Sequence, residues 1–213
     1  MRVARFLALG DSYTIGEGVV EAERWPNHLA RLLRAGGIEI EDPHIVARTA
    51  WTTDELADAM DADRPLGPYD LVSMLIGVND QYRSRPVRSF ADGFQLLLRR
   101  AIAFAGRRPS RVIAISIPDW GATPFAEGRD RALISREVEA YNARGVSLAR
   151  AAGVRWVDIT EITRRMQSEP ALVVSDGLHP SGEMYRLWAE LLLPIATAAL
   201  SRMRSKKGQS HDA

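Results

Sequence analysis

A serine, a histidine and an aspartate have the residue types that hydrolytic chemistry needs. Ser12 follows an apolar run through Gly10 and Asp11. An apolar run that stops at a glycine places the next hydroxyl at the carboxyl end of a strand, where α/β proteins keep their reactive groups. A serine there attacks a carbonyl if a base removes its proton and a further group orients that base. We therefore interpret Ser12 as a nucleophile.

The base is sought among the four histidines of the chain. Only His179 lies in a loop beside an acid, in the stretch Asp176-Gly177-Leu178-His179-Pro180. The others lie in the C-terminal tail, inside a predicted helix and at the start of a predicted buried strand. Asp176 precedes His179 by three residues, so one loop can present both side chains to the same point. Asp176 can then hold one imidazole nitrogen while the other faces Ser12.

Hydrogen-bond donors for a developing oxyanion come from two further positions. Asn79 follows the apolar run 70–76, and its side-chain NH2 can donate. Ala50 follows the run 44–47 and offers a backbone N–H, as does Ser12 itself. Three donors that converge on one point form an oxyanion hole, in which the loss of one donor typically costs about 10²–10³ in rate.

Strands and helices alternate along the chain and must position these residues. The pattern predicts five strands, at residues 2–9, 44–47, 70–76, 111–117 and 154–159. It predicts helices from Pro26 to about 35, from Thr52 or Thr53 through Met60, and at about 89–105, 131–152, 161–167 and 182–200. Residues 10–24 and 118–130 are predicted to be loops. This alternation predicts a parallel sheet with helices on both faces.

Length and composition fit one well-cored domain, which we expect to span residues 1–200 without a linker. The 213 residues include no cysteine, which excludes disulfides, thiolate metal sites and cysteine nucleophiles. The net charge of +1 gives no support to a nucleic-acid partner. Residues 201–213 lack an apolar pattern and are expected to form a disordered basic tail.

No segment suggests export, a membrane span or a bound metal. The N-terminal apolar run breaks at Gly10-Asp11, too early for a signal peptide, and no run approaches the length of a membrane span. We therefore expect a cytoplasmic protein. The histidines do not pair at the spacing of zinc ligands, and the serine chemistry needs no metal or cofactor.

Three short motifs occur along the chain: Gly10-Asp11-Ser12, Gly77-Val78-Asn79-Asp80 and Asp176-Gly177-Leu178-His179. In this order, at predicted strand ends or loops, they resemble the SGNH hydrolases, the GDSL-type esterases and lipases. The resemblance covers essentially the whole domain and implies a flavodoxin-like three-layer α/β/α sandwich and a serine esterase mechanism. It implies Ser12 as nucleophile, His179 as base and Asp176 as its partner, with Ser12, Ala50 and Asn79 as oxyanion donors.

One position departs from the family pattern. A further sequence block of the family, matched here by residues 47–53, usually has a glycine as oxyanion donor, and this chain has Ala50 at that position. The donor is a backbone N–H, which alanine also has, so the role can survive the change. If the position requires a positive φ, alanine costs roughly 1 kcal/mol there, and its methyl group narrows the hole.

Two tryptophans are candidates for contact with the substrate. Trp51 is next to Ala50 and could form a wall of an acyl pocket, although a core position explains it about equally well. Trp120 lies in the loop 118–130 together with Phe125. This loop is the best candidate for a substrate-facing lid, unless its apolar side chains simply pack onto the sheet.

The function that these residues indicate is hydrolysis of a small-molecule carboxylic ester through an acyl-enzyme, with an acetyl or other small acyl group favoured. A thioesterase or an acyltransferase could use the same triad. A third alternative is a flavodoxin-like binding module without catalysis, which would not react with a fluorophosphonate. The sequence leaves open the physiological substrate, the acyl length and the oligomeric state.

Overall fold

A five-stranded parallel sheet forms the centre of the protein. The computed structural model describes residues 2–201. The strands follow the spatial order β2-β1-β3-β4-β5, and each neighbouring pair is parallel. Their bounds are β1 Phe6–Gly10, β2 His44–Ala47, β3 Leu71–Leu75, β4 Val112–Ile115 and β5 Arg155–Val157. The central strands β1, β3 and β4 are buried along their whole length, as continuous apolar runs in a covered parallel sheet require.

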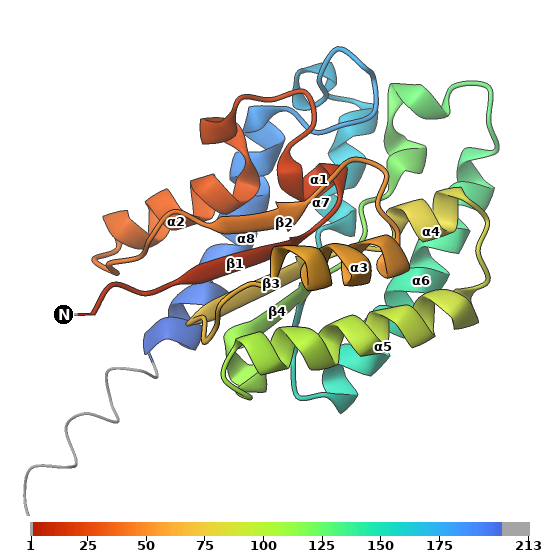
Figure 1. Ribbon diagram of the computed structural model, residues 1–213. Helices are drawn as coiled ribbons and strands as arrows, with labels where there is room; N and C mark the ends of the chain where they lie inside the picture. The colour runs from red at the N-terminus through yellow and green to blue at the C-terminus, as the bar shows by residue number, and fades with distance from the viewer. Residues whose placement is uncertain (1, 202–213) are drawn as a thin grey trace, which may run out of the picture.

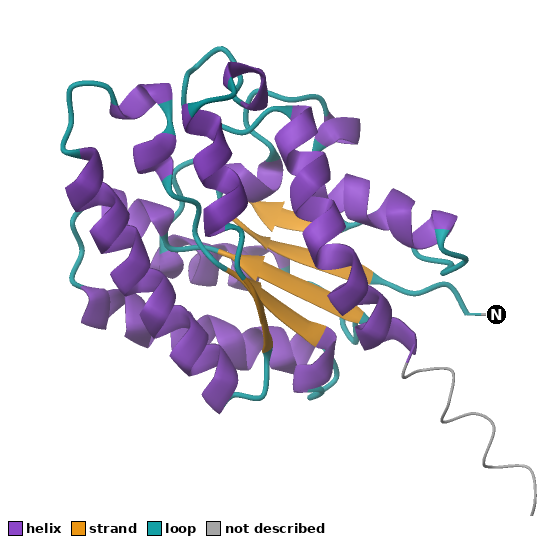
Figure 2. Cartoon of the chain, turned by 180° about the vertical axis from the view of Figure 1, so that it is seen from behind, coloured by secondary structure: helices purple, strands orange, loops and turns teal. Residues whose placement is uncertain are grey.

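Two layers of helices cover the sheet. Helices α2 (Trp25–Ala35) and α8 (Gly182–Ser201) pack against each other on one face. Helices α3 (Thr53–Asp63), α5 (Val87–Phe104) and α6 (Arg131–Ala151) cover the other face (Figure 1). Figure 2 shows the sheet from the opposite side, between these layers. The predicted flavodoxin-like α/β/α sandwich with five parallel strands is therefore confirmed.

The apolar stripe of α5 illustrates how the sequence fixes this packing. Phe90, Phe94, Leu97 and Ala101 recur at intervals of three or four residues, and they are buried together with the neighbouring Leu98. Side chains at this spacing share one face of a helix, which must be covered to remove them from water. The stripe therefore holds α5 against the sheet and α6.

The strand order creates a crevice at the carboxyl ends of β1 and β3. The chain leaves β1 toward β2 on one side and later returns to β3 on the other side of β1. In open α/β sheets, ligands bind at the point where successive connections part in this way. The segments that follow β1, β2 and β3 therefore meet at one edge of the sheet.

Short helical segments are the main difference from the sequence prediction. The predicted loop 10–24 contains helix α1 (Ser12–Ile15) and a 3-10 turn at Glu21–Glu23. Helix α4 (Val78–Tyr82) begins shortly after β3 and was missed, whereas the helix predicted at 161–167 is present as α7 (Thr160–Arg164). The segments α1 and α4 have only four or five residues and are too short to show helical periodicity, so the sequence pattern did not reveal them. Further 3-10 turns lie at Pro109–Arg111, Trp120–Ala122, Pro124–Ala126, Arg165–Gln167 and Pro170–Leu172.

The remaining expectations concern the C-terminal tail, membrane spans, the domain bounds and the cellular location. The predicted tail 201–213 lies outside the described residues, apart from Ser201 at the end of α8. Within residues 2–201, no helix combines the length and the apolar character needed to cross a membrane. The single domain over 1–200 and the cytoplasmic location stay predictions.

Candidate active site

Ser12 is the first residue of α1, one tight turn after β1. Gly10 ends the strand, and a Cβ there would lie 2.1 Å from the Thr14 hydroxyl oxygen and 2.6 Å from the Leu75 carbonyl oxygen, so only glycine fits. Asp11 caps α1 by accepting the Tyr13 N–H at 3.0 Å. The Ser12 N–H, at the start of the helix, has no partner within it and can serve an outside acceptor. Ser12 is 4% exposed.

Asp11 is a fully buried carboxyl group beside Ser12. Burial raises its pKa to about 8, and the negative charge of Asp80 adds to this increase. The hydrogen bond from the Tyr13 N–H acts in the opposite direction and lowers the pKa, but by less. Among the described residues, the second carboxyl oxygen of Asp11 has no hydrogen-bond partner. The folded protein therefore favours the protonated form of Asp11 near neutral pH.

We expect the stability advantage of Asp11→Asn over the wild type to grow as pH rises from 5 to 8. The pKa of Asp11 is higher in the folded than in the unfolded chain, where it is about 4, so wild-type stability falls with pH between these two values. Asparagine keeps the cap on Tyr13 and does not titrate. Melting curves at pH 5, 6.5 and 8 should show the difference in Tm widening by about 4 °C or more. Asp92→Asn, at an exposed site on α5, is the control, and a constant difference for Asp11→Asn would contradict this assignment.

Asp176 and His179 form a close pair in the loop before α8. His179 Nδ1 lies 2.6 Å from Asp176 Oδ2. The other carboxylate oxygen, Oδ1, accepts the backbone N–H groups of Leu178 at 2.7 Å and His179 at 2.9 Å. Gly177 adopts φ +74°, which the tight turn requires. Burial alone would raise the pKa of Asp176, but these hydrogen bonds outweigh it and hold the pKa below its usual range.

His179 faces the same cavity as Ser12. The imidazole is nearly buried, at 7% exposure, and the Tyr13 ring packs beside it at a centroid distance of 5.2 Å. Within residues 2–201, no hydrogen bond joins Ser12 Oγ and His179. In apo structures, such bonds are often long and tighten only when substrate binds.

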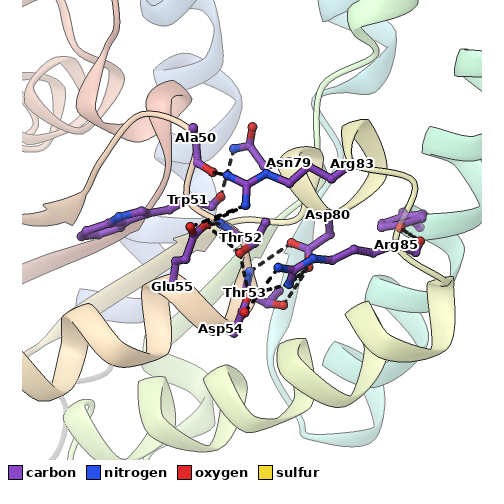
Figure 3. Close-up of polar contacts among 11 residues, drawn as sticks. Ala50, Trp51, Thr52, Thr53, Asp54, Glu55, Asn79, Asp80, Arg83 and Arg85 are labelled. Carbon is purple, nitrogen blue, oxygen red and sulfur yellow. Dashed lines mark hydrogen bonds and ion pairs between the residues drawn. The ribbon is translucent and has the colours of Figure 1, made fainter.

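Ala50 and Asn79 come from the segments that follow β2 and β3. Ala50 has φ +69°, the left-handed conformation that favours glycine. Asn79 lies in α4 and donates one amide hydrogen to the Trp51 carbonyl oxygen at 2.9 Å (Figure 3). An amide NH2 has two hydrogens, so the second stays available for another acceptor. Gly77 at φ +125° begins this turn, and a Cβ there would meet the Phe90 ring at 2.4 Å.

Ala50→Gly should stabilise the protein by about 1 kcal/mol, because glycine adopts the left-handed conformation without steric cost. For a chain of 213 residues, this corresponds to a rise in Tm of about 2–4 °C. Thermal unfolding followed by circular dichroism measures it. Ala140→Gly, at an exposed position within α6, is the matched control and should lower Tm instead. A lower Tm for both variants would show that no strain is stored at Ala50.

A polar network joins the loop after β2 to the residues after β3. Asp80 accepts the Thr53 N–H at 3.0 Å and the Thr53 hydroxyl at 2.9 Å. Arg85 pairs with Asp54 at 2.5 Å and with Asp80 at 3.4 Å (Figure 3). The sequence pattern does not connect Arg85 with these residues. The network fixes the segment that contains Ala50 against α4.

A cavity of about 180 Å³ brings the predicted residues together. Its lining includes Ser12, Ala50, Asn79, His179 and Trp120. Trp51, the other predicted contact residue, does not line this cavity: its ring extends away from Asn79, and only its carbonyl group takes part in the site (Figure 3). Tyr82, Phe125 and Leu178 line the cavity as well. Within residues 2–201, no group of three or more His, Cys, Asp or Glu side chains could hold a metal ion.

Comparisons with known proteins concern the family and the fold of the chain. A family model described as the GDSL-like Lipase/Acylhydrolase family matches residues 8–187. No curated protein matches the chain.

Three solved structures illustrate the fold that the chain shares. TesA has a TM-score of 0.72 at 17% identity, over 92% of this chain and 99% of its own. The acetyl xylan esterase AlAXEase has a TM-score of 0.69 at 16% identity, over 89% and 98%. The psychrotrophic esterase EstA from Pseudoalteromonas sp., in a structure inhibited by monoethylphosphonate, has a TM-score of 0.64 at 16% identity, over 97% and 100%. At these identities, the likeness shows a shared fold.

Proposed function

The chain belongs to the GDSL-like lipase/acylhydrolase family and is a carboxylic ester hydrolase, and we propose that Ser12, His179 and Asp176 form its catalytic triad. The observation that carries the proposal is the shared cavity. Ser12, Ala50, Asn79 and His179 come from four different segments of the chain and line the same space, while Asp176 pairs with His179. Family membership also favours an enzyme over a binding module.

In the proposed mechanism, Ser12 Oγ attacks the ester carbonyl carbon while His179 Nε2 takes the hydroxyl proton. The imidazolium then gives this proton to the departing alkoxide, which leaves as an alcohol, and an acyl-Ser12 ester remains. Water attacks the acyl group with His179 again acting as base, and the acid is released. Asp176 accepts a hydrogen bond from His179 Nδ1–H, so Nε2 is the nitrogen left free to accept the proton.

The oxyanion of each tetrahedral intermediate is proposed to accept hydrogen bonds from the backbone N–H groups of Ser12 and Ala50 and from Asn79 Nδ2. Donors that are fixed before the reaction begins stabilise the developing charge without reorganisation. The hydrogen bond from Asn79 to Trp51 provides this fixation for the side-chain donor, because it holds the amide in one orientation.

Asn79→Ala should lower kcat by about 10²–10³ while KM changes little, because its donor acts in the transition state. Steady-state kinetics on a soluble acetate ester provide both constants. Asn142→Ala removes a side-chain amide that binds the backbone of Ile117, just after β4, and serves as the control for lost hydrogen bonds. A change in KM alone would place Asn79 in substrate binding and not in the oxyanion hole.

We propose small-molecule esters with short acyl groups, including acetyl, as substrates. The limited volume of the cavity supports a compact substrate, and the likeness to an acetyl xylan esterase supports an acetyl group. Reaction with a fluorophosphonate, followed by peptide mapping, tests the proposed nucleophile. The adduct should appear on Ser12, and an adduct on any other residue would overturn the triad.

A further inference from the structure

Three aromatic rings form one wall of the cavity. The Tyr82 and Trp120 rings meet edge to face at a centroid distance of 5.4 Å, and Phe125 lies 6.1 Å from Trp120 and 6.3 Å from Tyr82. Trp120 is only 4% exposed, whereas Tyr82 is 46% exposed at the surface. Val78 and Leu178 add aliphatic surface. Next to the proposed nucleophile, the protein therefore offers a mostly apolar space.

Hydrogen bonds hold these three rings in place. Trp120 Nε1 donates to Gln81 Oε1 at 2.7 Å, and Gln81 Nε2 in turn donates to Glu137 Oε2 at 2.7 Å. The Phe125 N–H donates to the Gly177 carbonyl oxygen at 2.9 Å, which ties the wall to the loop of His179. Because both Trp120 and Phe125 are hydrogen-bonded to other segments, these rings do not move aside easily for a larger group.

The Arg129 guanidinium lies over the same three rings. Its guanidinium lies 4.9 Å from the Phe125 ring centroid, 5.5 Å from that of Trp120 and 5.6 Å from that of Tyr82. A cation over aromatic faces within about 6 Å is attracted to each ring. The three rings and Arg129 therefore form one packed unit, which we call the aromatic wall.

We propose that the aromatic wall limits the enzyme to esters whose apolar group is compact, no larger than about one six-membered ring or six carbons. The inference rests on the proposed function, because it places this group beside Ser12. The cavity holds about 180 Å³. An apolar protein cavity of about 150 Å³ accommodates benzene, so a ring or a short chain fills this space, and the further carbons of a long chain have to lie outside it. The group is either the acyl part or the alcohol part of the ester.

The test is a panel of esters with two arms. In the acyl arm, ethyl esters of acetate, butyrate, hexanoate, benzoate and decanoate are compared. In the alcohol arm, acetates of ethanol, butanol, hexanol, benzyl alcohol and decanol are compared. We expect kcat/KM in one arm to rise up to hexanoyl, benzoyl or their alcohol counterparts and then to fall about 10-fold or more at ten carbons. The arm that shows this break identifies the part of the ester in the cavity.

A pair of matched variants assigns the limit to the wall. Trp120→Leu should shift the break to longer chains, because it enlarges the cavity. Trp156→Leu is the same substitution at a tryptophan of β5 that lines a different cavity. It should leave unchanged the chain length at which kcat/KM falls. Phe125→Leu, at a partly buried position, gives the same test if Trp120→Leu does not fold.

The outcomes separate this inference from the proposed function. No hydrolysis of any ester and no reaction with a phosphonate would refute the proposed function. Hydrolysis with kcat/KM that is flat or still rising at ten carbons in both arms would refute the size limit alone. An unchanged break in both Trp120→Leu and Phe125→Leu would show that the limit does not come from the aromatic wall.

A second, independent observation concerns the strained residue Ala50. Arg83 Nη2 donates to the Ala50 carbonyl oxygen at 2.6 Å, and Arg83 Nη1 lies 3.4 Å from Glu55 Oε2 (Figure 3). Glu55 itself accepts the Thr52 N–H at 2.9 Å as part of the cap of α3. Arg83 thus connects the carbonyl of the strained residue to a fixed helix end.

We infer that Arg83 is a positioning residue for the Ala50 N–H in the oxyanion hole. For an alanine, the right-handed and extended backbone conformations have lower energy than φ +69°. Unless another contact prevents it, the loop would therefore relax to one of them and turn the Ala50 N–H away from the oxyanion. A charge-assisted hydrogen bond to the Ala50 carbonyl group is such a contact. It also explains how an alanine can stand at a position where the family usually has glycine.

Arg83→Met should lower kcat about 10-fold with little change in KM, less than the 10²–10³ that follows the loss of a whole donor. Arg83→Lys keeps a donor and should restore part of kcat. In the Ala50→Gly background, the effect of Arg83→Met should be smaller, because glycine adopts this conformation without steric cost. Arg88→Met removes an exposed charge nearby and is the control. An unchanged kcat in Arg83→Met, or the same loss in both backgrounds, would refute the role.

Discussion

Replacing Ser12 by alanine should lower kcat for ester hydrolysis by about 10⁴–10⁶-fold, the loss seen when a triad nucleophile is removed. Without Oγ, no acyl-enzyme forms, and only the donors and the bound geometry remain to help water attack. Reaction with a fluorophosphonate should disappear as well. Initial rates on a short-chain ester and mass spectrometry of the treated protein measure the two effects.

The Ser12→Ala variant should keep its fold, because the change removes one oxygen and leaves the cap of α1, which Asp11 supplies, untouched. Equal melting temperatures for variant and wild type check this. Ser89→Ala, at an exposed position in α5, is the matched control and should retain full activity. A Ser12→Ala variant with more than a few per cent of wild-type kcat would require a different nucleophile.

Asp176→Asn should lower kcat by about 10⁴-fold, because it imposes the wrong tautomer on His179. Asp176 Oδ1 accepts two backbone N–H groups, at 2.7 and 2.9 Å, so the carbonyl oxygen of an asparagine would occupy that place. Its NH2 group would then face Nδ1 and donate to it. The imidazole proton would move to Nε2, which could no longer accept the proton of Ser12.

The reaction rate and the pH dependence of stability should change together in Asp176→Asn. The pKa of Asp176 is lower in the folded than in the unfolded protein, so its ionised form contributes stability above pH 4 that is lost as the pH falls. The gap in Tm between wild type and variant should therefore narrow at low pH. Asp130→Asn, which keeps the oxygen that caps α6, is the control for the lost charge. A kcat close to that of the wild type would remove Asp176 from the triad.

Local sequence determined the elements of the site that depend on near neighbours. The pairing of Asp176 with His179 lies within one short loop, and the spacing of three residues was enough to predict it. Ser12 was predicted at a strand end because Gly10 interrupts an apolar run. The five strands and the long helices were predicted because their apolar periodicity extends over many residues.

Contacts between distant segments could not be predicted in the same way. The sequence left Trp51 and Trp120 as comparable candidates, and the structure places only Trp120 in the cavity, since its indole N–H reaches Gln81 across 39 positions of the chain. Helix α4 is too short to show periodicity, so nothing indicated that Arg83, directly after it, reaches the Ala50 carbonyl group.

Ala50 shows where the two kinds of information meet. The sequence established that alanine stands in place of glycine and made its cost conditional on a positive φ. Only the tertiary structure decided that φ is +69°, and it brings Arg83 to the Ala50 carbonyl oxygen and Asn79 to that of Trp51, both from the segment after β3. Residue types and local spacing therefore determined which chemistry is available. The long-range packing of the segments at the strand ends decided how these groups are oriented and how much space lies beside them.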